Sequence, residues 1–204
     1  MNALLSKEFM TLRSSLLALV VLGSLFALAF GHGSPSATCV IGVVMMSSVV
    51  GSSFSYDELY SWNLFAVSSG ISRRDIVRMK FALGAIIVAI GLVIGLAMTL
   101  VMTSIDGTAV DVGDLAGGIV LAASLGVTMF SVNCMVNYVF DSTRAQIVSI
   151  ALMVVMISGI VSLTTLGMTT DIPWIGSFAI VVAALVLFAA SYTVSMNRFL
   201  RKDL

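Results

Sequence analysis

Side chains that could carry out covalent chemistry are few and lie far apart along the chain. Cys39 and Cys134 stand in separate apolar stretches, and His32 is the only histidine. A nucleophilic Ser or Cys needs a nearby base, and a zinc site needs several His, Cys or carboxylate ligands. The sequence contains no such constellation and no GxxxxGK[ST] phosphate-binding loop. We therefore expect no enzymatic activity, and no metal or nucleotide bound by this chain itself.

Small and polar residues within the apolar stretches suggest helix packing or a transport pathway instead. Gly91 and Gly95 form a GxxxG pair, which lets two helix backbones approach closely within one chain or between two copies. Asn133 and Asn137 are four residues apart and share one helix face. Their amides are expected either to bond across to another helix or to contact a substrate.

The chain has 13 methionines, among them the adjacent Met45 and Met46. One interpretation is that these side chains only fill space between helices or face lipid. The other is that a flexible, polarizable lining accepts varied apolar cargo.

The composition indicates that lipid surrounds the elements that carry these residues. Of the 204 residues, 59% are hydrophobic and only 10% are charged, and the mean hydropathy is +1.13. A soluble domain is about 45–50% apolar and roughly a quarter charged. Because so few polar residues cannot cover a water-soluble globule, we predict one all-α integral membrane domain over residues 1–204.

Six apolar stretches are predicted to be transmembrane helices, each needing about 20 residues to cross the hydrocarbon core. The predicted spans are residues 15–30, 37–54, 81–105, 115–140, 145–168 and 174–196. With this assignment, every charged residue lies in a loop or near the end of a span. That placement argues against an ion-coupled secondary carrier, which usually has charged residues inside the membrane.

The basic residues predict the orientation of these spans. All ten Lys and Arg residues fall on one side: before the first span, in the second and fourth connections, and after the sixth span. The opposite side carries Asp106, Asp111, Asp114 and Asp171 and no basic residue. Because basic residues near span ends stay in the cytoplasm, both termini are predicted to be cytoplasmic in a multi-pass plasma membrane protein.

The first residues could form a cleaved signal peptide or a retained helix. Glu8 falls in the segment that a signal peptide would need to be basic, and Leu5, Phe9 and Leu12 recur at helical spacing. This pattern favours a short amphipathic helix that lies on the inner membrane surface and leads into a retained first span.

The segment between spans two and three, residues 55–79, is the only substantial stretch predicted to lie outside the membrane. Ser55-Tyr56-Asp57-Glu58 has the form of a capping box, and Leu59, Trp62 and Phe65 follow at helical spacing. Together they predict a short amphipathic helix over residues 57–67. Such a helix would either rest on lipid or dock into a groove on a soluble partner.

Two further signals complete this segment. Ser68-Ser69-Gly70 predicts the end of the short helix. Ser72-Arg73-Arg74-Asp75 is a second capping-box form that opens the helix of span three. The long side chains of Arg78 and Lys80 are predicted to snorkel to the membrane surface there.

These residues carry a resemblance to a known family. Asp57-Glu58, Trp62, the run 71–77 and Lys80 resemble the signature of small type-2 ABC exporter permeases, in particular the group containing the phenol-soluble modulin exporter permeases. Residues 5–9 resemble that family's N-terminal helix, and residues 140–144 resemble its turn after span four. The chain departs from the family pattern at Gly70, where Pro is common, and near Asn137, where a basic residue is common.

The resemblance implies that residues 55–79 contain a coupling helix seated on a separate ATPase. The implied coupling residues are Asp57, Glu58, Leu59, Trp62, Phe65, Ser72, Arg73, Arg74 and Asp75. Two ATPase subunits would bind ATP and Mg, and a second copy of this chain, or a related permease, would complete the pathway. The implied cargo is an amphipathic peptide or another membrane-active compound leaving a bacterial cell, with no nucleic-acid partner. The alternatives are a non-transporting immunity or sensor protein and a secondary transporter.

Overall fold

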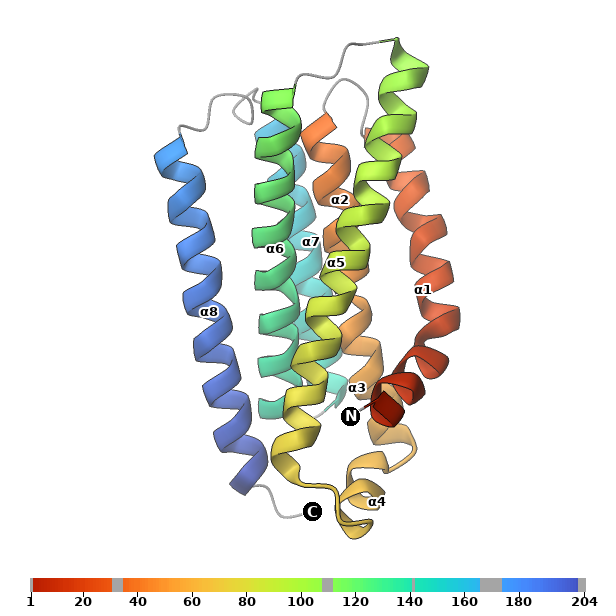
Figure 1. Ribbon diagram of the computed structural model, residues 1–204, viewed down its shortest axis with the longest axis vertical. Coiled ribbons are helices and arrows are strands. Elements are labelled where there is room, and N and C mark those ends of the chain that lie inside the picture. The colour runs from red at the N-terminus through yellow and green to blue at the C-terminus, as the bar shows by residue number, and fades with distance from the viewer. Residues whose placement is uncertain (1, 31–34, 108–111, 141, 166–173, 202–204) are drawn as a thin grey trace.

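The apolar stretches form long helices that run side by side in the computed structural model (Figure 1). The structure describes residues 2–30, 35–107, 112–140, 142–165 and 174–201. These residues form eight helices and no strand, as the all-α prediction requires. The helices are α1 (Asn2–Phe30), α2 (Pro35–Ser47), α3 (Val49–Leu59), α4 (Trp62–Ser68), α5 (Arg73–Asp106), α6 (Val112–Val139), α7 (Ser142–Thr165) and α8 (Trp174–Arg201).

Five helical stretches within the described residues are long and apolar enough to cross a membrane. They are Leu5–Phe26, Ala37–Leu59, Arg73–Ile105, Leu115–Val139 and Phe178–Arg201. The second comprises α2 and α3, which are interrupted only at Ser48. Three helices are longer than the predicted spans. Helix α1 begins at Asn2 rather than at residue 15, α3 ends at Leu59 rather than at residue 54, and α5 begins at Arg73 rather than at residue 81. The predicted span 145–168 falls on α7, which is not among the five, and its last three positions lie outside the described residues.

Helix α1 contains both the segment predicted as a short amphipathic helix and the predicted first span. It is continuous from Asn2 to Phe30. Leu12 is fully buried, and Leu5 and Phe9 pack against the buried core of the bundle. The apolar face recognised in the sequence therefore contacts protein rather than only lipid.

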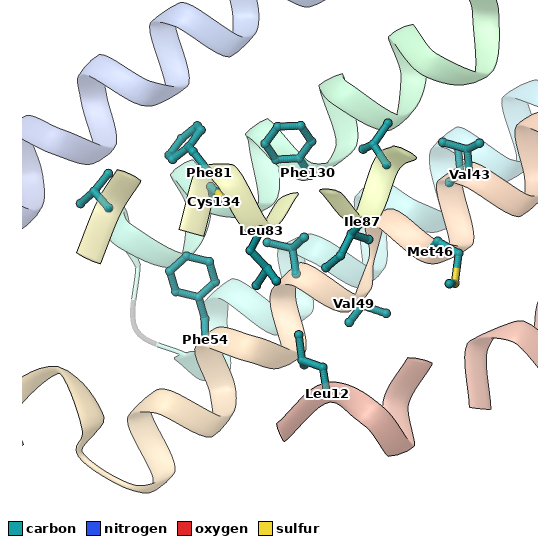
Figure 2. Close-up of a cluster of buried hydrophobic side chains, with 14 of the residues drawn as sticks. Leu12, Val43, Met46, Val49, Phe54, Phe81, Leu83, Ile87, Phe130 and Cys134 are labelled. Carbon is teal, nitrogen blue, oxygen red and sulfur yellow. The ribbon is translucent and has the colours of Figure 1, made fainter. Parts of the chain in front are cut away.

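Helix α2 is the centre of the bundle, and every described side chain from Ala37 to Ser47 is buried. A helix that is apolar on all sides needs neighbours on all sides. Helices α1, α5 and α6 supply them. Figure 2 shows buried side chains of this core, including Val43 and Met46 of α2 beside Ile87 of α5.

Glycines allow α2 and α5 to touch backbone to backbone. A Cβ atom added to Gly95 would lie 2.8 Å from the carbonyl oxygen of Cys39, and one added to Gly42 would lie 3.0 Å from Cα of Gly95. A Cβ atom on Gly91 would lie 3.2 Å from Cα of Val43. The GxxxG pair therefore packs against α2 of the same chain, which is the first of the two interpretations offered by its sequence.

Aromatic rings join α5, α6 and α8. Phe81 makes edge-to-face contacts with Phe130, Phe188 and Tyr192, with ring centroids 6.2, 5.6 and 5.2 Å apart. Phe130 can lie flat on α5 because Gly84 has no side chain there (a Cβ atom would be 2.4 Å from the ring). Phe81 and Phe130 are labelled next to each other in Figure 2.

One end of the bundle carries α4, together with the beginning of α1 and the end of α8 (Figure 1). The long connection between α3 and α5 therefore lies close to both ends of the chain. The charged residues of the predicted coupling segment are gathered at this end.

Candidate functional site

Residues 57–67 do not form the single helix that their spacing predicted. Helix α3 continues unbroken from Val49 to Leu59, so Ser55 lies inside a helix, and its hydroxyl donates to the carbonyl of Gly51. Ser61 then takes a left-handed conformation with φ of 49°. This turns the chain before the short helix α4. The capping-box prediction at residues 55–58 was wrong, because the helix that begins at Val49 continues through these residues to Leu59.

The second capping prediction is confirmed. Ser72 is extended and precedes α5, its hydroxyl accepts a hydrogen bond from the backbone N–H of Asp75, and it also donates to the Asp75 carboxylate. Gly70, with φ of 84°, follows α4 where the sequence predicted its end. A left-handed residue after a short helix favours glycine, because other side chains are strained there.

An apolar surface lies on α4 and the turn before it. Leu59, Tyr60, Leu64 and Phe65 are 72, 72, 57 and 59% exposed. We call these four residues the α4 surface. Its opposite side faces the bundle, where Ala66 is fully buried. These residues lie at the end of the bundle, so water or a partner is their natural neighbour if the long helices span a membrane.

Trp62 differs from the α4 surface because it faces inward. The indole is only partly exposed and packs against the buried core. The Lys7 ammonium lies 4.4 Å from the centre of its ring. Such a contact between a cation and an aromatic face contributes about 0.5–2 kcal/mol. Trp62 therefore anchors α4 to α1.

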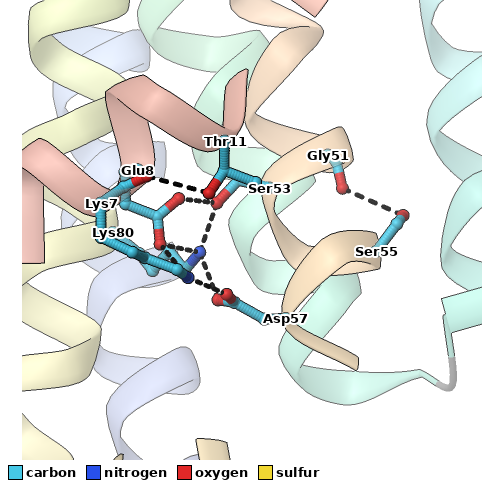
Figure 3. Close-up of polar contacts among 8 residues, drawn as sticks. All are labelled: Lys7, Glu8, Thr11, Gly51, Ser53, Ser55, Asp57 and Lys80. Atoms are coloured by element: carbon cyan, nitrogen blue, oxygen red, sulfur yellow. Dashed lines mark hydrogen bonds and ion pairs between the residues drawn. The ribbon is translucent and has the colours of Figure 1, made fainter. Parts of the chain in front are cut away.

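A buried charge cluster lies beneath α4, formed by Lys7 and Glu8 of α1, Ser53 and Asp57 of α3, and Lys80 of α5 (Figure 3). Lys80 Nζ lies 2.9 Å from Glu8 Oε1 and 2.5 Å from Asp57 Oδ2, and it also contacts Ser53. Lys7 Nζ lies 3.1 Å from Glu8 Oε1 and 2.5 Å from Asp57 Oδ1. The Ser53 hydroxyl donates to Glu8 Oε2 at 2.5 Å.

The charge cluster is balanced, and it is shielded except at Lys7, whose side chain is 26% exposed. Its two ammonium groups match its two carboxylates, and Glu8, Asp57 and Lys80 are each no more than 2% exposed. Buried charges are expensive unless they are paired and hydrogen-bonded, and here each has at least two partners. The cluster joins α1, α3 and α5, which are far apart in sequence.

Two predictions about these residues were wrong. Asp57 was expected on an exposed coupling helix, and Lys80 was expected to extend to the membrane surface, but both are buried and ion-paired. The physical reason is that the Lys80 ammonium and the Asp57 carboxylate form an ion pair, which offsets the cost of burying each charge. Their pairing with Glu8 was missed, although an isolated acid and an isolated base beside apolar residues in separate helices are the signal that could have suggested it.

The other predicted coupling residues lie around this end of the bundle. Glu58, Arg74 and Asp75 are exposed. Arg73 instead donates to the backbone carbonyls of Phe199 and Leu200 at 3.4 and 3.2 Å. These carbonyls belong to the last turn of α8, where a cation is favourable. Arg73 therefore links the start of α5 to the end of α8.

A cavity of about 400 Å³ opens beside α3, between α1, α6 and α7. Both predicted amides, Asn133 and Asn137, line it. Their amide groups donate to the backbone of their own helix, Asn133 to Met129 and Asn137 to Asn133, rather than across to another helix as expected. The remaining lining residues are Ser15, Ala18, Leu19, Leu22, Ser48, Gly51, Ser52, Ser55, Met129, Gln146, Ser149 and Ile150.

Met45 and Met46 do not line this cavity. Both are buried in α2, at 3 and 2% exposure, and Met46 packs near Gly91. Within the part of the chain that the structure describes, no three His, Cys, Asp or Glu side chains are arranged to bind a metal ion.

Comparison with known proteins identifies the family. The model of the ABC-2 family transporter proteins matches residues 3–199, almost the full length of the chain. Neither a curated protein nor a solved structure matches. A family match of this extent, on a chain with several long apolar helices, shows a multi-pass membrane protein of the permease type. The chain belongs to the ABC-2 family of transporter proteins, the membrane-spanning subunits of ABC transporters.

Proposed function

We propose that this chain is the permease subunit of an ATP-driven exporter, with a separate ATPase docked on the α4 surface. The exporter would contain two copies of the chain, or one copy and a related permease, and two ATPase subunits that bind ATP and Mg. Its cargo would be an amphipathic peptide or another membrane-active compound, as the resemblance to the phenol-soluble modulin exporter permeases implies.

The observation that carries this proposal is the α4 surface itself. Four large apolar side chains are exposed at the end of the bundle, Leu64 and Phe65 on α4 and Leu59 and Tyr60 at the end of α3 and in the turn that follows. A protein groove that accepts an amphipathic helix would remove them from water.

The contacts between α4 and the bundle explain how a displacement of α4 by an ATPase would be transmitted to the long helices. Trp62 rests on Lys7, and Lys7 binds Asp57 at the end of α3. Asp57 binds Lys80 of α5. Because these bonds are short and shielded from water, displacement of α4 by an ATPase would move α1, α3 and α5 together rather than only bending a loop.

The proposed topology has six spans and cytoplasmic termini in a bacterial plasma membrane. Helix α7 would be the additional span, because its 24 residues rise about 36 Å at 1.5 Å per residue, more than the hydrocarbon core of about 30 Å. The α4 end would face the cytoplasm, since the basic residues from Lys7 to Arg201 gather at the corresponding helix ends.

Co-purification with the candidate ATPase tests the proposal. The variant Leu64→Ala with Phe65→Ala removes two side chains of the α4 surface without touching the charge cluster. The matched control, Val154→Ala with Val155→Ala, removes two side chains of α7 that are equally exposed, at 60 and 65%. Trp62 is left intact because its replacement would also loosen α4.

We expect the wild type and the α7 control to retain the ATPase in detergent and the α4 variant to lose it. All three should insert into the membrane and elute as single species. Retention of the ATPase by the α4 variant would contradict docking on this surface. If no ATPase accompanies the wild type, the exporter itself is refuted.

A further inference from the structure

The cavity beside α3 contains a hydrogen-bond acceptor without a partner among the described residues. Asn133 is 1% exposed, and among the described residues its side-chain oxygen Oδ1 has no hydrogen-bond partner. Its amide nitrogen is held by the carbonyl of Met129 at 3.1 Å. Oδ1 lies 3.5 Å from the position that a Cβ atom on Gly51 would take, so it lies close to α3 at the wall of the cavity. A buried acceptor without a partner is costly, and a bound donor would remove that cost.

A second observation at the same site is a tightened turn between α2 and α3, where Ser48 keeps helical angles, with φ of −68° and ψ of −21°. At Ser48 and Gly51 the backbone N–H groups bond three residues back, to Met45 and Ser48, and the Ser48 hydroxyl also donates to the Met45 carbonyl. Both Ser48 and Gly51 line the cavity. A tightened turn in the middle of a helix often marks a functional position.

The lining of the cavity has two chemically different sides and no charged residue. Helix α1 contributes the apolar Ala18, Leu19 and Leu22 and one hydroxyl, that of Ser15, whereas most of the lining side chains of α3, α6 and α7 carry hydroxyl or amide groups. The buried Ser149 Oγ also lacks a hydrogen-bond partner among the described residues. A volume of about 400 Å³ falls in the range of small-molecule sites.

We propose that this cavity binds an uncharged amphiphile, with its apolar chain against α1 and an N–H or O–H group donating to Asn133 Oδ1. Charged head groups are disfavoured because no lining side chain can compensate them. The exposed Leu22 of α1 and Ile150 of α7 flank the cavity, so the ligand enters sideways between these helices. This inference rests on the proposed function in one respect, that the occupant is cargo awaiting export.

A neutral membrane lipid has the same combination of an apolar chain and an uncharged donor group. The experiment must therefore distinguish bound cargo from bound lipid. The probe is an alkyl amide with a dodecyl chain, a diazirine beside the amide and an alkyne at the far end. A matched probe carries a carboxylate in place of the amide. Each is photolysed with the purified chain in lipid nanodiscs without ATPase, and the labelled positions are mapped by mass spectrometry.

Three variants make the test specific. Gly51→Leu extends a side chain into the cavity over Asn133 Oδ1, Asn133→Leu removes the acceptor at similar size, and Gly117→Leu is the matched control. A Cβ atom at Gly117 meets nothing within 4 Å, and Gly117 does not line the cavity. Both glycine replacements improve helix propensity, so neither should unfold the chain.

We expect the amide probe to label cavity positions on α3, α6 and α7 in the wild type and in Gly117→Leu. Gly51→Leu should abolish this labelling, and Asn133→Leu should weaken it about threefold to tenfold, the effect of one lost hydrogen bond. Labelling spread evenly over the long helices and unchanged by Gly51→Leu would overturn the site. Equal labelling by the carboxylate probe would overturn its preference for neutral ligands.

Native mass spectrometry then distinguishes the two sources. A lipid that co-purifies with the wild type but not with Gly51→Leu would identify the occupant as lipid and overturn the cargo assignment. Displacement of the amide probe by an uncharged amphipathic peptide, without a co-purifying lipid, would support cargo. Because labelling needs no ATPase, its failure leaves ATPase docking on α4 standing, and the failure of docking leaves the cavity standing.

Discussion

Removing the charge of Lys80 is the sharpest test of the buried cluster. In the variant Lys80→Met, Glu8 and Asp57 would share only Lys7, so the cluster would carry one uncompensated negative charge. Lys80 is 1% exposed and contacts both carboxylates within 2.9 Å. Breaking a buried ion pair from one side costs about 3–5 kcal/mol, chiefly because the remaining charge stays buried. For a chain of 204 residues this corresponds to roughly 6–20 °C in Tm.

The assay is thermal unfolding of the purified protein in detergent, with two comparisons. Arg78→Met removes the same kind of charge from an exposed pair with Asp75, 3.9 Å apart, and should change the stability by less than about 1 kcal/mol. The double variant Lys80→Met with Glu8→Gln restores the balance, because Lys7 and Asp57 remain paired. It should be more stable than the sum of its single variants by about 0.5–3 kcal/mol.

Two outcomes would refute this reasoning. If Lys80→Met and Arg78→Met lower Tm equally, then burial does not determine how much Lys80 contributes to the stability of the protein. If the effects of Lys80→Met and Glu8→Gln simply add, the two side chains are not coupled, and the contacts in Figure 3 do not contribute to stability as a unit.

Three further predictions concern the packing and capping of the helices. Gly95→Ala places a Cβ atom 2.8 Å from the Cys39 carbonyl, so α2 and α5 must separate, and thermal unfolding should show a loss of about 1–3 kcal/mol. Phe130→Ala empties a fully enclosed ring position between α5, α6 and α8 and should cost about 3–5 kcal/mol in the same assay. Ser72→Ala removes the cap of α5, which should cost about 1 kcal/mol and speed hydrogen exchange at the Asp75 amide.

Each of these predictions has a control of the same chemical kind. Gly117→Ala adds a Cβ atom to a helix glycine with open space around it, and Phe178→Ala removes a ring that is 67% exposed. Ser104→Ala removes a hydroxyl from the exposed face of α5. Shifts in the controls as large as those in the test variants would contradict the assigned contacts.

The charge cluster and the cavity lie next to each other on α3. Ser53 and Asp57 belong to the cluster, whereas Gly51, Ser52 and Ser55 line the cavity. One short helix therefore carries both features on different faces. Under the proposed function, a displacement that begins at α4 would reach the ligand cavity through α3 without passing through a flexible loop.

The amino-acid sequence by itself determined the class of the protein and the boundary between α4 and α5. Apolar composition requires long helices, because a backbone in lipid must satisfy its own hydrogen bonds. The start of α5 at Ser72 and the turn at Gly70 were predictable because capping and left-handed turns depend on only a few neighbouring residues. The family resemblance likewise came from a short run of residues and agrees at the family level with the full-length match.

Only the tertiary structure decided which distant residues meet. Glu8 and Lys80 are separated by 72 positions, and helical periodicity says nothing about which face of one helix opposes which face of another. For that reason Asp57 and Lys80 seemed to belong to a polar surface, although together with Glu8 and Lys7 they form a neutral, largely buried cluster. The same limit applied to Gly95, whose neighbour proved to be Cys39 of the same chain, and to Asn133, whose free oxygen is defined only by the helices around it.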